Sequence, residues 1–385
     1  MQLRGYIYGL VGVVFLFWAC RKKDEPRPPQ APIARFFLDS IILEGENRLP
    51  SRFTLHWYGE DPDGYVVGFE LRMDGGPWKF TTANESTFVV TFLPGEQIKD
   101  VIFELRAVDN QGLRTEPPAR LRVPLRNSPP SCRIETSVAP PDTTLPAITL
   151  SLRIEDLDGV ETVDSLYIRV GSGEWVALSP RHTLLTFVPQ DPTQVSPTRV
   201  YSGTSLTPLL TLSASIALDD TNRIYVRAKD QGGLFSPPDS TRAIYVRRKT
   251  ADWLVIDSWS DDAARNELAS DWQAAWGRYD YWTLRSSTQR PPLRLPTWLH
   301  IWRLYPRIYW LGSISALGEL EAAETLIERY LLGGGRLFVN FPLSSSLDKG
   351  SPIFRWSPVD SLPSAVQNGL LPPGGAVVAQ GGGFP

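Results

Sequence analysis

The chain contains very little cysteine, only Cys20 and Cys132 among 385 residues. Two cysteines exclude a disulfide-rich scaffold and a metal site built from several thiolates. Neither sign of charge predominates, because 39 basic and 42 acidic residues give a net charge of −3, and this balance predicts no nucleic-acid partner. The apolar run Ile7–Phe17 has about eleven residues, too few to span a bilayer stably. Proline (34) and glycine (30) are plentiful instead, as in turn-rich β proteins.

The first twenty residues, MQLRGYIYGLVGVVFLFWAC, have the pattern of a secretory signal. Arg4 supplies a positive start, the apolar run follows, and the small residue Ala19 precedes Cys20. The pattern resembles a bacterial lipoprotein signal, although the two residues before Ala19 are bulkier than that family usually has. The resemblance implies that residues 1–19 are removed and that Cys20 is lipidated. The alternative is an ordinary signal with a chance cysteine.

The segment after the cysteine, residues 20–31, is charged and rich in proline, and it predicts a disordered tether. Its KKDE stretch at 22–25 resembles the export signal of surface-exposed Bacteroidetes-type lipoproteins; a solvated linker is the alternative. These resemblances imply a bacterial cell-envelope protein held to the outer membrane through its lipid, on either face. If Cys20 carries lipid, Cys132 has no partner for an intrachain disulfide.

Two consecutive segments repeat the same landmarks in the same order. The first contains EDPDG, DGGPW, RAVDNQGL and PP in turn, and the second contains EDLDG, GSGEW, RAKDQGGL and PP. Repetition over this many landmarks indicates tandem domains. The second copy carries an insertion of about two dozen residues, at about 182–207, rich in Pro, Thr and Ser. It predicts a surface excursion, with a binding loop as the alternative.

Both copies read as all-β. Phe53–Trp57 and Ile148–Ile154 alternate apolar and polar residues, and Asp-Gly and Gly-Gly turns separate such runs. Short strands over about 100 residues predict a β-sandwich. We therefore predict one sandwich over residues 32–126 and a second over residues 127–248. Their motifs resemble fibronectin type III or immunoglobulin-like modules of secreted bacterial proteins, which implies a fold and no particular activity.

The repeated acidic turns are the candidate metal site. Their carboxylates are Asp61, Asp63, Asp109, Asp156, Asp158 and Asp230. Such oxygens suit calcium. The competing interpretation, which we favour, is that Asp-x-Asp-Gly caps a tight turn, since aspartate binds its own backbone and glycine accepts positive φ.

The pattern changes at Ala251, where short apolar runs begin to alternate with helical periodicity. This predicts a parallel sheet with helices over residues 251–342. The predicted strands are Trp253–Asp257, Tyr279–Leu284, Arg307–Leu311 and Arg336–Phe341, and the predicted helices are Asp261–Arg278, Trp298–Leu304 and Gly318–Leu332. Residues 343–385 are rich in Ser, Pro and Gly and predict an irregular tail, either the end of a truncated domain or a poorly encoded last strand.

The runs IYWLGS, ELEAAETLIERYLLGGG and RLFVNFP resemble the class I glutamine-amidotransferase-like, flavodoxin-like fold. That family's activity needs a cysteine nucleophile with His and Glu partners, but this region has no cysteine and one histidine, His300. The resemblance therefore implies a catalytically degenerate relative. Ser313 is a weak candidate nucleophile, because Leu311 and Ser315 stand where Gly-x-Ser-x-Gly requires glycine and no histidine follows it. Carboxylates are the other candidates: Asp257, Asp261 and Asp262.

Nine of the thirteen tryptophans also fall in this last region. Their four-residue spacings favour helix–sheet packing over a stacking platform for sugars. The sequence predicts no cofactor. Its leading functional interpretation is an anchored, non-catalytic lipoprotein with the sandwiches as a stalk and the α/β domain as a head for glycan or protein binding. The alternatives are a hydrolase using Ser313 or carboxylates, and a structural subunit of an envelope complex.

Overall fold

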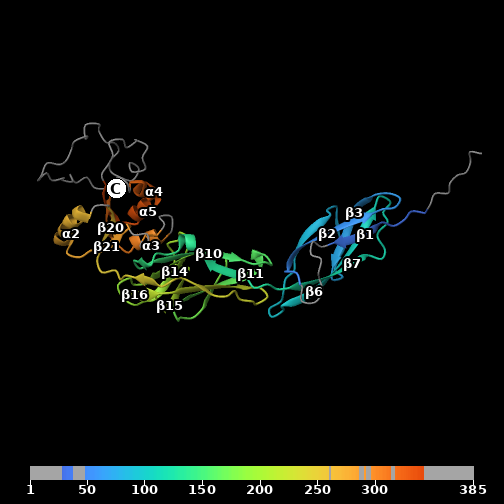
Figure 1. The fold of residues 1–385 in the computed structure, drawn as a ribbon, viewed down its shortest axis with the longest axis horizontal. Coiled ribbons are helices and arrows are strands. Elements are labelled where there is room, and N and C mark those ends of the chain that lie inside the picture. Colours follow the sequence, from blue (N-terminus) through green and yellow to red (C-terminus); the bar gives the residue numbers. More distant parts are fainter. Residues whose placement is uncertain are drawn as a thin grey trace, which may run out of the picture. The chain divides into compact units, whose positions relative to one another are not determined.

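The computed structural model describes residues 28–37, 48–259, 262–285, 290–291, 296–313 and 317–341 (Figure 1). The predictions for Cys20, Asp261 and the tail at 343–385 fall outside these ranges. The chain divides into two compact units at Arg126/Asn127, with Thr91–Glu96 grouped with the second. A search of the described helices for one long and apolar enough to cross a membrane found none.

The first unit is a sandwich of two antiparallel sheets, with strand orders β1-β2-β5 and β4-β3-β6-β7. Its strands are β1 (Ile33–Phe37), β2 (Arg52–Glu60), β3 (Val66–Met73), β4 (Lys79–Thr81), β5 (Glu85–Val89), β6 (Ile98–Asp109) and β7 (Ala119–Arg126). Alternate residues point inward, as Phe103, Leu105 and Ala107 on β6 show, since all three are fully buried. Leu55 and Trp57 on β2 close the core from the other sheet.

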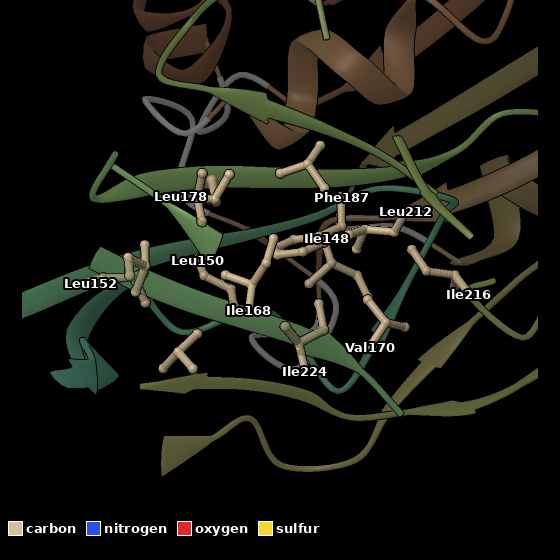
Figure 2. Close-up of a cluster of buried hydrophobic side chains, with 14 of the residues drawn as sticks. Ile148, Leu150, Leu152, Ile168, Val170, Leu178, Phe187, Leu212, Ile216 and Ile224 are labelled. Atoms are coloured by element: carbon tan, nitrogen blue, oxygen red, sulfur yellow. The ribbon is translucent and has the colours of Figure 1, made fainter. Parts of the chain in front are cut away.

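The second unit begins with another sandwich. Its strands are β8 (Ser131–Ile134), β9 (Thr143–Thr144), β10 (Ile148–Glu155), β11 (Val163–Val170), β12 (Val176–Leu178), β13 (Leu184–Pro189), β14 (Pro197–Ser202), β15 (Leu210–Ser215), β16 (Asp220–Asn222), β17 (Ile224–Asp230), β18 (Asp239–Ser240) and β19 (Ile244–Val246). The main sheets have orders β15-β14-β13-β10-β8 and β12-β11-β17-β18, with a small third sheet β16-β19-β9. Figure 2 shows Ile148 and Leu150 of β10 meeting Ile168 of β11 in the core. The predicted pair of β-sandwiches is confirmed.

The insertion in the second sandwich contains β13 and β14, which pair within the main sheet, so the predicted surface excursion at 182–207 is wrong. Strands β5 and β13 are in corresponding places, because β5 pairs with β2 in the first sandwich and β13 pairs with β10 in the second. After them come residues 90–97 in the first copy and residues 190–223 in the second, and the longer segment adds β14 and β15 to the sheet. The many Pro, Thr and Ser residues concealed the alternation that buries Phe187 and Val200 completely.

The rest of the second unit contains a parallel sheet of order β21-β20-β22-β23. Its elements are β20 (Trp253–Ser258), α2 (Asp262–Trp276), β21 (Asp280–Thr283), α3 (Thr297–Trp302), β22 (Arg307–Gly312), α4 (Leu317–Ala322), α5 (Glu324–Leu332) and β23 (Arg336–Asn340). These match the predicted strands and helices, except that the last helix breaks at Ala323. Helix α2 covers one face of the sheet through Trp272, while α3 and α5 cover the other through Trp302 and Ile327.

The second sandwich and the parallel sheet share one hydrophobic core. Along β13, Phe187 points into the sandwich core, whereas its neighbour Val188 belongs, with Tyr201, to the hydrophobic cluster that contains Trp298 of α3. The Tyr201 and His300 rings lie 4.2 Å apart between centroids. Strand β13 is therefore buried on both faces, and the two folds form one packed body.

Five tryptophans of this region are buried core residues: Trp272, Trp282, Trp298, Trp302 and Trp310. The predicted packing role is confirmed for them. None of the five offers an exposed face on which a sugar could stack.

Candidate functional site at the carboxyl edge of the parallel sheet

Ligands of open α/β sheets bind outside the carboxyl ends of the strands. At this edge Asp257 is the last residue but one of the inner strand β20 and is completely buried. One of its oxygens accepts the backbone N–H of Trp259 at 2.9 Å. The other accepts the Tyr281 hydroxyl of β21 and lies 3.4 Å from Nη1 of Arg265 on α2. A buried carboxylate needs such partners, because leaving one unpaired would cost several kcal/mol.

Arg265 connects the buried carboxylate to the protein surface. Its other guanidinium nitrogen lies 2.6 Å from Asp262, which is also paired with Arg285. Hydrogen bonds from Arg285 and then Arg265 lower the pKa of Asp262, so this candidate acid is ionised at neutral pH and engaged on both sides. Burial, followed by the hydrogen bond to Asp257, raises the pKa of Tyr281.

A second polar group occupies the same edge beside the first. Ser258 accepts the indole N–H of Trp310 at 3.1 Å and donates to Oε2 of Glu319 at 3.2 Å. The other oxygen of Glu319 lies 2.6 Å from Arg290. The sequence did not single out Ser258 or Glu319, since they are 61 positions apart. The one signal available in the sequence was a serine at the end of a predicted strand together with a Glu-rich helix much later in the chain.

Ser313 directly follows β22 at this edge and is buried, with 9% of its surface exposed. His300 does not serve it as a base, because the imidazole packs against Tyr201 in the shared core. Burial, aided by Arg303 and Arg329, lowers the pKa of His300 to about 4, so the ring is neutral at pH 7. The edge thus gathers Asp257, Asp262 and Ser313, but their side chains are bonded into the fold or covered.

The acidic turns of the first sandwich hold backbone N–H groups. Asp109 is buried and accepts from Gln111 and Leu113, both at 2.8 Å. Asp61 accepts from Asp63 at 3.3 Å. These are the bonds of capped turns.

The second sandwich repeats this arrangement. Asp156 accepts from the N–H of Asp158 at 2.9 Å, and Asp230 accepts from Leu234 at 2.8 Å and from the side chain of Asn127 at 2.9 Å. Burial, with the charges of Asp158 and Asp230, raises the pKa of Asp156 to about 6. Within the residues that have described positions, no group of three or more His, Cys, Asp or Glu side chains is arranged to hold a metal ion. The bonds seen are those of turn capping, the interpretation that the sequence favours, and calcium binding stays the untested alternative.

Cys132 is a free thiol buried on β8. Burial, reinforced by the charge of Asp239, raises its pKa to about 12. The side chain therefore stays a neutral thiol at neutral pH and behaves as a small apolar core residue.

Fold and site together define a protein of two β-sandwiches followed by a parallel α/β sheet. No protein-family model matches the chain, and neither does any curated protein. Among solved structures, the PKD1 domain of Vibrio anguillarum Epp is 16% identical and covers 26% of this chain and 100% of its own length, at a TM-score of 0.20. The fibronectin(III)-like modules of Clostridium thermocellum CbhA are 15% identical over 55% of this chain and 94% of theirs, at 0.21.

A 1.5-MDa bacterial ice-binding adhesin is 13% identical, and the match covers 55% of this chain and 63% of the adhesin chain at a TM-score of 0.18. At these identities and scores the likenesses assign the chain to none of these groups. Its sandwiches are established by the pairing of its own strands.

Proposed function

We propose that the chain is a membrane-anchored bacterial cell-envelope lipoprotein of the binding or scaffold type, without catalytic activity. In this proposal Cys20 carries the lipid, the sandwiches form a stalk, and the parallel-sheet domain is the head that binds a glycan or another envelope protein. The signal-like first twenty residues and the charged segment after them support the anchor.

The burial and the bonds of Asp257 are the observation that supports the proposed absence of catalytic activity. This carboxylate occupies the position where α/β sheets present groups to ligands, yet it is wholly buried and bonded to Trp259, Tyr281 and Arg265. A general acid or base must come within hydrogen-bond reach of its substrate. The buried Asp257 instead ties β20, β21 and α2 together.

We also propose that the head is a degenerate flavodoxin-like domain related to class I glutamine-amidotransferase-like domains. The strand order β21-β20-β22-β23 supports this, because numbering these strands along the chain gives 2-1-3-4, the beginning of the flavodoxin-like order. The core that the head shares with the second sandwich favours a scaffold, since it fixes the head rigidly to the module before it.

The anchor is tested by expressing the full chain in a Gram-negative bacterium supplied with radiolabelled palmitate. We expect the wild type to be labelled and membrane-bound, and Cys20→Ser to lose both properties. Cys132→Ser is the matched control and keeps them, because its thiol is buried. Label that persists in Cys20→Ser would contradict the anchor.

Binding is tested with the full chain on an array of bacterial glycans and by crosslinking in envelope membranes, alongside ester and glycoside hydrolysis assays. We expect a bound glycan or a crosslinked envelope protein and no turnover. Reproducible turnover that disappears in Ser313→Ala would establish the hydrolase and overturn the proposal.

A further inference from the structure

Corresponding sheets of the two sandwiches both carry arginines stacked on a tryptophan. In the sheet β4-β3-β6-β7, the guanidinium carbons of Arg72 and Arg106 lie 4.3 and 4.5 Å from the ring centroid of Trp78. In the sheet β12-β11-β17-β18, those of Arg169 and Arg227 lie 4.7 and 4.5 Å from Trp175. Cation–π attraction and ring contact hold each guanidinium in a fixed plane.

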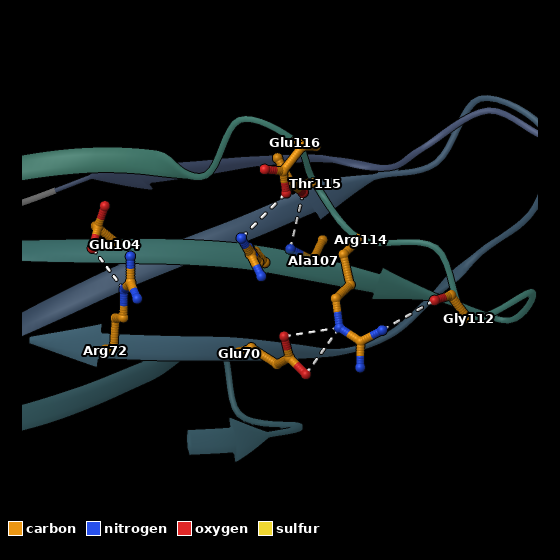
Figure 3. Close-up of polar contacts among 9 residues, drawn as sticks. Glu70, Arg72, Glu104, Ala107, Gly112, Arg114, Thr115 and Glu116 are labelled. Carbon is orange, nitrogen blue, oxygen red and sulfur yellow. Dashed lines mark hydrogen bonds and ion pairs between the residues drawn. The ribbon is translucent and has the colours of Figure 1, made fainter. Parts of the chain in front are cut away.

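In the first of these sheets, carboxylates form ion pairs with the arginines (Figure 3). Arg72 is paired with Glu104 at 2.6 Å, and Arg114 with Glu70 at 3.0 Å. Arg106 forms a third ion pair, to Glu116 at 3.2 Å.

The second sheet lacks these carboxylates. On the first sheet Glu70 lies opposite Arg106 and Glu104 lies opposite Arg72. On the second sheet tyrosines take both places, because Tyr167 lies opposite Arg227 and Tyr225 lies opposite Arg169. Proline follows the corresponding serine where glutamate follows threonine in the first copy, so the counterpart of Glu116 is also lost.

Among the described residues, three cationic side chains of the second sheet therefore have no carboxylate as an ion-pair partner. We call Arg169, Arg227 and Lys229 the cation row. Across the described part of the chain, no ion pair engages any of the three, whereas tyrosine, tryptophan and phenylalanine rings support them. All three side chains are partly exposed. The row lies on the sheet that does not form the shared core with α3 and α5.

The spacing of the cation row matches an extended chain. Arg227 and Lys229 are two residues apart on β17, which places them about 6.6–6.8 Å apart. Arg169 lies diagonally across from Arg227 on the neighbouring strand, at about 7–8 Å. An extended peptide with acidic residues at alternate positions displays its carboxylates about every 6.6–6.8 Å.

We propose that the cation row binds an extended acidic peptide segment that carries Asp or Glu at alternate positions. A guanidinium fork binds a carboxylate through two parallel hydrogen bonds, and here the stacked rings already orient the forks. An acidic peptide fits better than an acidic glycan, because two guanidinium groups already lie over Trp175, the largest ring on this sheet. This inference is independent of the lipid anchor and of the head.

The test measures fluorescence anisotropy of a labelled dodecapeptide of alternating Glu and Thr with the full chain at low salt. The decisive variant, Tyr167→Glu/Tyr225→Glu, installs the two carboxylates that the first sandwich has. We expect it to weaken binding by about tenfold or more, since it neutralises the row internally. Arg227→Gln/Lys229→Gln gives the same loss by a second route, should the first variant misfold. Circular dichroism and melting verify the fold of each.

The matched control is Arg72→Gln/Arg106→Gln, which removes the stacked but neutralised pair of the first sandwich. We expect its affinity to stay within about twofold of the wild type, because those cations already have carboxylate partners. The proposal is overturned if a block peptide of six Glu and six Thr binds equally well, or if folded Tyr167→Glu/Tyr225→Glu binds like the wild type. Tighter binding of polygalacturonate than of the peptide would also overturn it, in favour of an acidic glycan.

Discussion

Replacing Asp156 by asparagine should stabilise the chain at neutral pH and leave its stability unchanged in acid. Burial, with the nearby charges of Asp158 and Asp230, raises the pKa of Asp156 from 3.8 to about 6. The native state therefore favours the protonated carboxyl more than the unfolded state does. Stability from this group is fully present below pH 4 and is lost as the pH rises through about 6.

The difference between the pKa of 3.8 and the pKa of about 6 for Asp156 corresponds to about 3 kcal/mol. The side chain is only partly buried, so screening by water reduces this, and we expect a gain of about 1–1.5 kcal/mol above pH 6. Asparagine retains the oxygen that caps the N–H of Asp158 and removes the charge. In a unit of this size the gain corresponds to a melting temperature higher by about 2–6 °C.

The assay is thermal melting of the full chain at pH 4, 5, 6, 7 and 8, with and without millimolar calcium. Asp61→Asn is the matched control in the first sandwich, where burial also raises the pKa of the carboxyl, so a gain of the same sign is expected. A gain that is equal at pH 4 and pH 8 would refute the electrostatic reasoning. Wild-type melting that rises with calcium, and does not in Asp156→Asn, would establish a calcium site instead.

Three further predictions follow from packing and burial. Cys132 should resist iodoacetamide at pH 8 in the native chain and react only after denaturation, because burial raises its thiol pKa to about 12; peptide mass spectrometry reads the label, and rapid native labelling would contradict the burial. Trp298→Ala should cost about 3–5 kcal/mol in denaturant unfolding and separate the transitions of the second sandwich and the parallel sheet, since it opens the shared core; an unchanged single transition would count against that core. Tyr281→Phe should cost about 1–3 kcal/mol by removing a donor from the buried Asp257, and a neutral result in the same measurement would show that this bond is not needed.

The strands and helices were predictable from the sequence where the apolar residues recur with the period of a strand or of a helix. Phe103–Ala107 alternates apolar and charged residues, and Leu268, Trp272 and Trp276 recur at helical spacing, so local pattern alone indicated strand and helix. The strands of the insertion were not predictable, because Thr and Pro residues interrupt the alternation of apolar and polar residues there. Phe187 and Val200 are opposite each other in the paired strands β13 and β14, and only this pairing shows that both are buried.

The candidate site was predictable only in part. Asp257 was identified because an acidic residue ends an apolar strand. Its partners Tyr281 and Arg265 come from β21 and α2, and no local pattern connects them to it. His300 was considered for catalysis from its residue type alone, and the tertiary structure places it against Tyr201.

By itself, the sequence determined the tandem sandwiches, the alternation of strands with helices and the isolation of Cys132, since repeats, periodicity and composition are properties of the chain read locally. Tertiary structure alone decided that Val188 and Tyr201 join the head in one core, because β13 is apolar on both faces and its sequence does not say what covers each. It also decided which arginines are neutralised, because ion pairs such as Arg72–Glu104 depend on the register between strands that are distant in sequence.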